Sequence, residues 1–158
     1  MAIDIGAGAI DRTTSSGGDL TWIDLTNPAN ATGSLDTVEI WANQQLEGCE
    51  VATFYTTTDY STRDSELIGT VTAGSKQTFS GLSIDVSTND YLGLHHTGGY
   101  IERSSSGGSG VKYKAGDYIP CTNETGWSTL ADDSISTYGT GTEGAPPPTF
   151  TPRITGII

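Results

Sequence analysis

Apolar and polar residues alternate along several short stretches of the chain. In SLDTVEIWAN, Val38 and Ile40 are separated by a single glutamate. In GLSIDV, Leu82, Ile84 and Val86 alternate with serine and aspartate. A period of two places every second side chain on one face of an extended strand, whereas a helix repeats every 3.6 residues. Both stretches are therefore predicted to be half-buried β-strands.

Further strands are predicted where short runs rich in β-branched and aromatic residues lie between turn-forming segments. These runs are 20–25, 49–57, 66–73, 90–97, 110–115 and 134–139. Clusters of Gly, Asn, Asp and Ser bound them, and no amphipathic helical pattern separates them. This pattern predicts an all-β fold, an antiparallel two-sheet β-sandwich of jelly-roll type, with a closed barrel as the alternative.

The composition changes near the C-terminus, which divides the chain into three predicted parts. Residues 1–139 are the β-sandwich domain, and 140–148, rich in Gly, Thr and Pro, are a hinge and spacer. Residues 149–158 are an extended apolar arm that packs on another subunit or, alternatively, on its own domain. The residues expected to bind a partner are Phe150, Pro152, Arg153, Ile154, Ile157 and Ile158.

The net charge of the chain limits the classes of molecule that we expect it to bind. Seven Lys and Arg residues oppose nineteen Asp and Glu residues, for a formal net charge of −12. Such a charge repels phosphate backbones and anionic membranes, so neither nucleic-acid nor membrane binding is expected. Arg103, Lys112 and Lys114 form either one local positive face or ordinary solvated charges. The first residues lack a signal-peptide pattern, so we expect leaderless production in a reducing cytoplasm.

Two cysteines and a few acidic loops are the candidates for covalent or metal chemistry. Cys49 and Cys121 are expected to stay free thiols, with a long-range disulfide as the alternative. Loop oxygens offer calcium binding as an alternative to plain acidic turns, and the residues concerned are Asp59, Asp64, Glu66, Asn89 and Asp90. We expect no cofactor and no metal.

The sequence contains few groups that would support catalysis. His95 and His96 are the only histidines, and neighbours on a strand point to opposite faces, so they do not chelate one metal together. We expect one to be packed and the other solvent-exposed at a strand end. Acidic pairs at 64 and 66, or at 132 and 133, offer a glycosidase alternative without any sign of a cleft between them. We expect no enzymatic activity.

Large aromatic residues offer a second kind of candidate site. Trp22, Trp41 and Trp127 lie in or beside predicted strands and are expected to pack in the core, with a sugar-stacking platform as the alternative. A carbohydrate-binding module would expose aromatic rings on one face beside carboxylates or amides. The candidate glycan-binding residues are Trp41, Tyr55, Tyr60 and Tyr100.

The most specific stretch covers residues 60–113, YSTRDSELIGTVTAGSKQTFSGLSIDVSTNDYLGLHHTGGYIERSSSGGSGVKY. A strand, the turn TAGSKQTFSGL, a strand ending in a turn aspartate and a Gly/Ser hairpin follow one another there. This order resembles that of small, mostly uncharacterised proteins of tailed bacteriophages and prophages, and the resemblance covers roughly residues 5–140. It implies a virion component and transfers no catalytic motif.

Together these features predict a capsid decoration or cement protein, assembled in the host cytoplasm into a virion. Its partners would be copies of itself, the major capsid protein or a tail protein, contacted through the arm. The main alternative is a tail-associated or cell-surface carbohydrate-binding module. A minor hydrolase and a surface filament subunit that exchanges strands are further alternatives.

Overall fold

The computed structural model describes residues 1–144. These residues contain twelve β-strands and no helix, which confirms the predicted all-β class. All pairings between the named strands are antiparallel. The strands are β1 (Ala2–Ile5), β2 (Thr14–Gly17), β3 (Leu20–Asp24), β4 (Gly33–Thr56), β5 (Tyr60–Val71), β6 (Lys76–Val86), β7 (Tyr91–His96), β8 (Gly98–Ser104), β9 (Val111–Ala115), β10 (Ser128–Leu130), β11 (Ser134–Ile135) and β12 (Thr137–Glu143).

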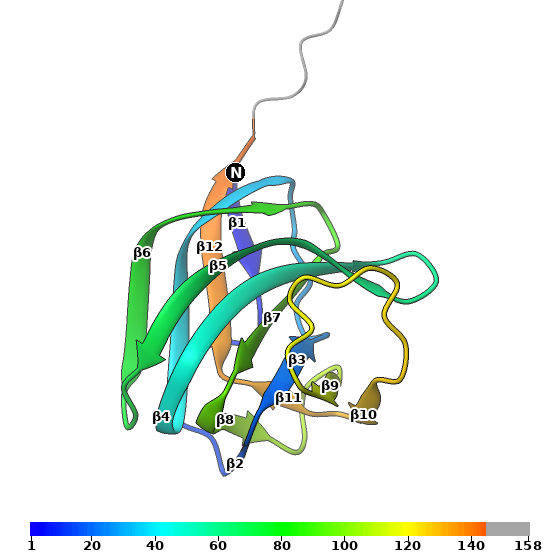
Figure 1. Ribbon diagram of the computed structural model, residues 1–158. Coiled ribbons are helices and arrows are strands. Elements are labelled where there is room, and N and C mark those ends of the chain that lie inside the picture. The colour runs from blue at the N-terminus through cyan, green and yellow to red at the C-terminus, as the bar shows by residue number, and fades with distance from the viewer. Residues whose placement is uncertain (145–158) are drawn as a thin grey trace, which may run out of the picture.

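Strand β4 organises the fold because it is 24 residues long and pairs along both edges. Its first part lies between β6 and β12, its middle pairs with β8, and its last part lies between β5 and β7. Register shifts interrupt its ladders at several points, and irregularities of this kind bend a strand. Figure 1 shows the resulting curve of β4 through the molecule.

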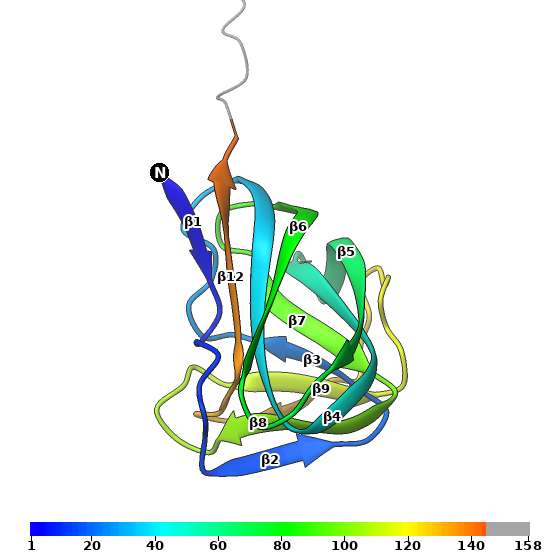
Figure 2. The ribbon, with the colours of Figure 1, turned by 90° about the vertical axis from the view of Figure 1, so that its left-hand side faces the viewer.

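Because β4 pairs with five other strands along its length, the strands form one connected sheet. Its path is β1-β12-β4-β7-β3-β9-β10, while β5, β6 and β8 join β4 beside this path and β2 and β11 pair with β8. The structure therefore does not show the two separate sheets of the predicted jelly-roll sandwich. It shows an antiparallel sheet that curves back over itself around an apolar core (Figure 2).

The core is built from the inward-facing side chains of strands far apart in the sequence. Ile3 of β1, Leu35 of β4 and Leu94 of β7 are fully buried in it. Trp22 of β3 is 1% exposed and packs against Tyr113 of β9 with 5.5 Å between the ring centroids. The expected core role is therefore confirmed for this tryptophan.

A second apolar cluster covers the opposite face of β3, β4 and β7. Ile23, Ala52 and Phe54 are buried there with Ile119, which belongs to the loop between β9 and β10. Trp127, at the end of that loop, packs edge-on against Phe54 with 6.5 Å between the ring centroids. The loop, yellow in Figure 1, thus covers a sheet face that would otherwise expose apolar side chains.

The two ends of the described chain meet at one end of the molecule. Strand β1 pairs with β12, and the N-terminal ammonium of Met1 lies 3.2 Å from Glu143 Oε2. Figures 1 and 2 both show β1 and β12 reaching the same end. The predicted boundary after residue 139 needs correction, because 140–143 are not a hinge but part of β12 and pair with β1 and β4.

Candidate functional site

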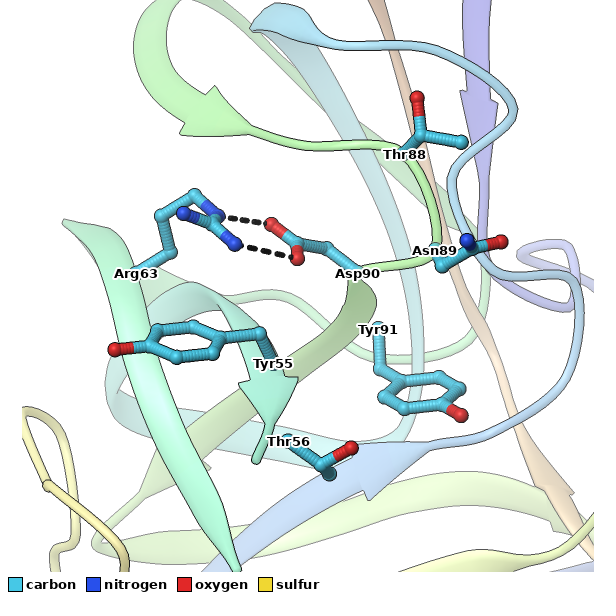
Figure 3. A pocket seen from close by; sticks show the side chains of 7 residues that line it. All are labelled: Tyr55, Thr56, Arg63, Thr88, Asn89, Asp90 and Tyr91. Atoms are coloured by element: carbon cyan, nitrogen blue, oxygen red, sulfur yellow. Dashed lines mark hydrogen bonds and ion pairs between the residues drawn. The ribbon is translucent and has the colours of Figure 1, made fainter. Parts of the chain in front are cut away.

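A hollow with a volume of about 290 Å³ lies where the end of β4, the start of β5 and the turn between β6 and β7 meet. Its size is close to the lower end of the range of roughly 300–1,000 Å³ that is typical of small-molecule sites. The hollow has room for about one sugar-sized ring. Figure 3 shows the residues that line it, which are Tyr55, Thr56, Arg63, Thr88, Asn89, Asp90 and Tyr91.

A β-bulge brings Arg63 to this hollow. The residues on either side of Arg63 pair with two consecutive residues of β4, Thr53 and Phe54, so Arg63 has no partner in the ladder. The extra residue of a bulge changes the direction of its side chain. The guanidinium of Arg63 lies over the ring of Tyr55, with Cζ 4.6 Å from the ring centroid, and faces Asp90.

Arg63 and Asp90 form a two-point ion pair (Figure 3). Arg63 Nε donates to Asp90 Oδ2, and Nη2 donates to Oδ1 over 3.0 Å. The side chain of Asp90 is 3% exposed and that of Arg63 is 31% exposed, so the carboxylate is the buried partner. The hydrogen bond to Asp90 raises the pKa of Arg63. The guanidinium and the carboxylate lie against one another, so their opposite charges compensate.

The turn between β6 and β7 is held in place by backbone hydrogen bonds to the β3–β4 loop. Asn89 N donates to Ala29 O over 2.8 Å, and Ala29 N donates to Asp90 O over 2.9 Å. Asn89 has a φ of 73°, a conformation that asparagine adopts more readily than most residues. The turn therefore fixes the backbone of Asn89 at the rim of the hollow.

Contacts between aromatic rings support the other side of the hollow. Tyr91 packs edge-on against Tyr60 with 6.3 Å between the ring centroids, and Tyr60 packs against Trp127 at 6.0 Å. Such contacts are favourable by about 0.5–1.5 kcal/mol each beyond simple burial. They restrict the position of the Tyr91 ring, so this wall of the hollow is formed before any ligand binds.

Several polar groups of the hollow have hydrogen-bonding capacity to spare. Within residues 1–144, nothing hydrogen-bonds the hydroxyls of Tyr55, Thr56 and Tyr91, the side-chain amide of Asn89, or Nη1 of Arg63. Aromatic rings combined with a few convergent polar groups are typical of sites for small polar ligands. No group of three or more His, Cys, Asp and Glu side chains suited to a metal ion occurs in the same part of the chain.

We expect Arg63→Met to lower the free energy of unfolding by about 3 kcal/mol, because it leaves the buried Asp90 carboxylate without its counter-charge. Urea unfolding at neutral pH measures the change. The matched control is Lys76→Met, which breaks the exposed pair with Glu39 and should change stability by less than about 1 kcal/mol. Equal effects of the two substitutions would contradict a buried, structurally important pair at the hollow.

The structure divides the four predicted glycan-binding residues. Tyr55 lines the hollow, and Tyr60 lies beside it through its contact with Tyr91. Trp41 lies in the first part of β4, opposite β6, and Tyr100, 42% exposed, lies on β8. No ring contact between described residues joins Trp41 or Tyr100 to the hollow. The predicted set is therefore not one platform.

Four of the acidic residues considered for calcium or for glycosidase chemistry have structural partners, namely Asp64, Glu66, Asp90 and Asp133. Asp64 Oδ2 accepts the backbone N–H of Asp85 over 2.8 Å, and Glu66 Oε2 accepts that of Ser83 over 3.0 Å. These bonds satisfy donors along β6 that its ladder with β4 does not use. Asp90 pairs with Arg63, and Asp133 pairs with Arg103.

The two histidines lie on opposite faces of β7, as predicted. Both are buried, so the expectation that one of them is exposed to solvent is wrong. His95 Nε2 lies 2.6 Å from Asp19 Oδ1. His96 Nε2 accepts the indole N–H of Trp22 over 3.0 Å. Burial lowers the pKa of His96 to about 4. His96 is therefore a neutral core residue at physiological pH and not a site for metal or acid–base chemistry.

A second buried ionisable group lies near the end of β3. Asp24 is fully buried, and its two carboxylate oxygens accept the backbone N–H groups of Thr26 over 2.8 Å and Ile135 over 2.9 Å. Burial raises the pKa of Asp24 to about 6, although these donors and the charge of Arg12 act in the opposite direction. Asp24 therefore links the end of β3 to β11.

The structure shows the simpler alternative both for the cysteines, which form no disulfide, and for the basic residues, which form no separate positive face. Cys49 and Cys121 are free thiols, and burial raises the pKa of Cys49 to about 12. Arg103 is paired with an aspartate and Lys114 with a glutamate, while Lys112 donates to a threonine hydroxyl. These three cations are thus largely engaged within the protein and do not form a free positive face.

Sequence reasoning missed Arg63 and considered Asn89 and Asp90 only as an alternative calcium site beside plain turn residues. The turn signal at 87–90 was readable, but neither a bulge nor the partner of Asp90 has a local signature. The predicted arm residues Phe150, Pro152, Arg153, Ile154, Ile157 and Ile158 lie outside the described residues.

No helix in residues 1–144 is long and apolar enough to cross a membrane. The chain matches no protein-family model and no curated protein.

Proposed function

We propose that this protein is a structural protein of a bacteriophage particle, a decoration or cement protein exposed on the capsid and anchored or oligomerised through residues 149–158. A tail-associated position is the alternative within the same role. The acidic all-β fold and the resemblance of residues 60–113 to small phage proteins support this proposal. The proposed role needs no catalytic residue. The protein would become part of the virion after assembly in the host cytoplasm.

The observation that carries the proposal is the meeting of the two ends of the described residues, at Met1 and Glu143, at one end of the molecule (Figure 1). Because the chain continues from Gly144 at that end, attachment through residues 149–158 would leave the opposite end facing solvent. We also propose that the curved sheet is a jelly-roll-like sandwich, an architecture used by viral capsid and lectin domains.

We expect the full chain to form a defined oligomer and a version ending at Gly144 to be a monomer. Burying two or three of the apolar arm side chains on a neighbour contributes on the order of 5 kcal/mol before ordering costs. Size-exclusion chromatography with light scattering measures the mass, and thermal unfolding confirms that both versions fold. Ile154→Asp should act like the truncation, whereas the matched control Thr151→Asp should not. Folded monomers in every case would contradict self-association through the arm.

A second function, carbohydrate binding, is favoured by the hollow at the end of β4. It combines the tyrosine rings of positions 55 and 91 with hydroxyl and amide groups, and with Nη1 of Arg63, that have no hydrogen-bond partner among the described residues. Carbohydrate-binding modules combine aromatic faces with polar groups in this manner. Such a site would serve a tail-associated or cell-surface module, or a capsid protein that contacts glycans.

A further inference from the structure

We propose that the hollow formed by Tyr55, Arg63, Asn89 and Tyr91 binds a single uncharged sugar ring and discriminates against acidic sugars. This inference rests on the carbohydrate-binding function proposed above and adds the site and the ligand class. It follows from the charge, the size and the hydrogen-bonding capacity of the hollow.

The charge of the hollow favours an uncharged ligand. Arg63 is the cation of the lining, and its two-point pair with Asp90 compensates it. Neither lysine nor a second arginine lines the hollow, and the whole chain carries a net charge of −12. The carboxylate of an acidic sugar would therefore lose hydration without gaining an unpaired counter-charge.

The shape and the aromatic content favour a ring over a linear polyol. The volume of about 290 Å³ suits roughly one pyranose ring with its hydroxyls. The C–H faces of such a ring are apolar, while its hydroxyls project around the edge. Tyr91 offers a ring held in position by Tyr60, and Tyr55 offers a second ring braced by the guanidinium of Arg63.

The polar groups match the needs of sugar hydroxyls, which both donate and accept. Asn89 supplies an amide with two donors and an acceptor oxygen, and the tyrosine hydroxyls donate or accept. Arg63 Nη1 supplies donors only, while its Nε and Nη2 hold Asp90. The backbone bonds of the turn hold the main chain at Asn89 in place, so that ligand binding orders only its side chain.

The test begins with a glycan array probed with the labelled full chain. A neutral oligosaccharide that binds there is then titrated by calorimetry against the wild type and against Asn89→Gly and Tyr91→Phe. Glycine adopts the φ of 73° at position 89 readily, so Asn89→Gly removes the amide and keeps the turn. We expect each variant to weaken binding about tenfold, as losing a hydrogen bond to the ligand does.

The matched control is Asp132→Gly, which replaces another exposed residue of positive φ, 62°, away from the hollow. It should leave the affinity within about twofold. Galacturonic and N-acetylneuraminic acid conjugates should bind at least about tenfold more weakly than the neutral sugar. This inference would be overturned if neither Asn89→Gly nor Tyr91→Phe changed the affinity, or if acidic sugars bound as well as neutral ones. Either result would leave the proposed carbohydrate binding in place. Absence of any glycan signal would overturn both.

Discussion

Gly93→Ala should lower the free energy of unfolding by about 3 kcal/mol or more, or prevent folding altogether. Gly93 lies in the middle of β7, between β3 and β4. A Cβ atom there would lie 2.2 Å from the backbone O of Trp22 and 2.6 Å from Cε2 of Phe54. Both neighbours are buried and cannot move without disturbing an apolar cluster, so one added methyl group forces the sheet apart.

The matched control for this prediction is Gly98→Ala. At Gly98 the nearest atom to an added Cβ is Cγ of Glu47 at 3.9 Å, an ordinary contact with a flexible side chain. That variant should change stability by less than about 1 kcal/mol. Thermal and urea unfolding of the two variants beside the wild type measures the difference. Wild-type stability of Gly93→Ala would mean that β7 does not pack as closely against β3 and Phe54 as the structure shows.

His96→Gln should make the protein gain stability as the pH falls from 6.5 to 4, whereas the wild type should change little. The folded-state pKa of His96 is about 4, below its ordinary value of 6.5. The stability that neutral His96 contributes is therefore complete above pH 6.5 and is lost as the pH falls toward 4, by about 3 kcal/mol. Glutamine retains an acceptor for the Trp22 indole and does not titrate.

Asp24 acts in the opposite direction over nearly the same pH range. Its folded-state pKa is about 6, above its ordinary value of 3.8, so protonation on acidification favours the folded state by about 3 kcal/mol. In the wild type the two effects nearly cancel, and Asp24→Asn should show the loss from His96 alone. Urea unfolding at pH 7, 5.5 and 4 measures each slope. Parallel curves for the wild type and His96→Gln would contradict a buried neutral histidine.

The local pattern predicts several of the strands, but it misses β1 and β8. The alternating residues Val38, Ile40, Ile84 and Val86 are buried as expected, because a period of two depends only on the extended backbone. The runs at 20–25 and 110–115 correspond to β3 and β9. Short polar strands, such as β2 and β10, lack this pattern, and they form because their neighbours offer backbone partners.

Pairing between strands far apart in the sequence explains where the structure differs from the prediction made from the local pattern. The pattern predicts separate strands at 34–43 and 49–57, but these stretches and the polar run between them form one bent strand, which β8 pairs with in its middle. Likewise, residues 60–65 lie in a turn-forming segment between the predicted strands 49–57 and 66–73, but they form the start of β5. Local sequence reports the preference of a segment, whereas the partner across the ladder decides whether a polar segment stays extended.

The sequence by itself determined that this chain is all-β, strongly acidic and without a recognisable catalytic motif, because these properties depend on composition and on spacing between near neighbours. Only the tertiary structure decided that Arg63 meets Asp90, that Asp64 and Glu66 bond the backbone of β6, and that Tyr55 shares a hollow with Asn89. Those contacts join strands through bulges and bends of β4 and β5, whose positions depend on packing across the whole sheet.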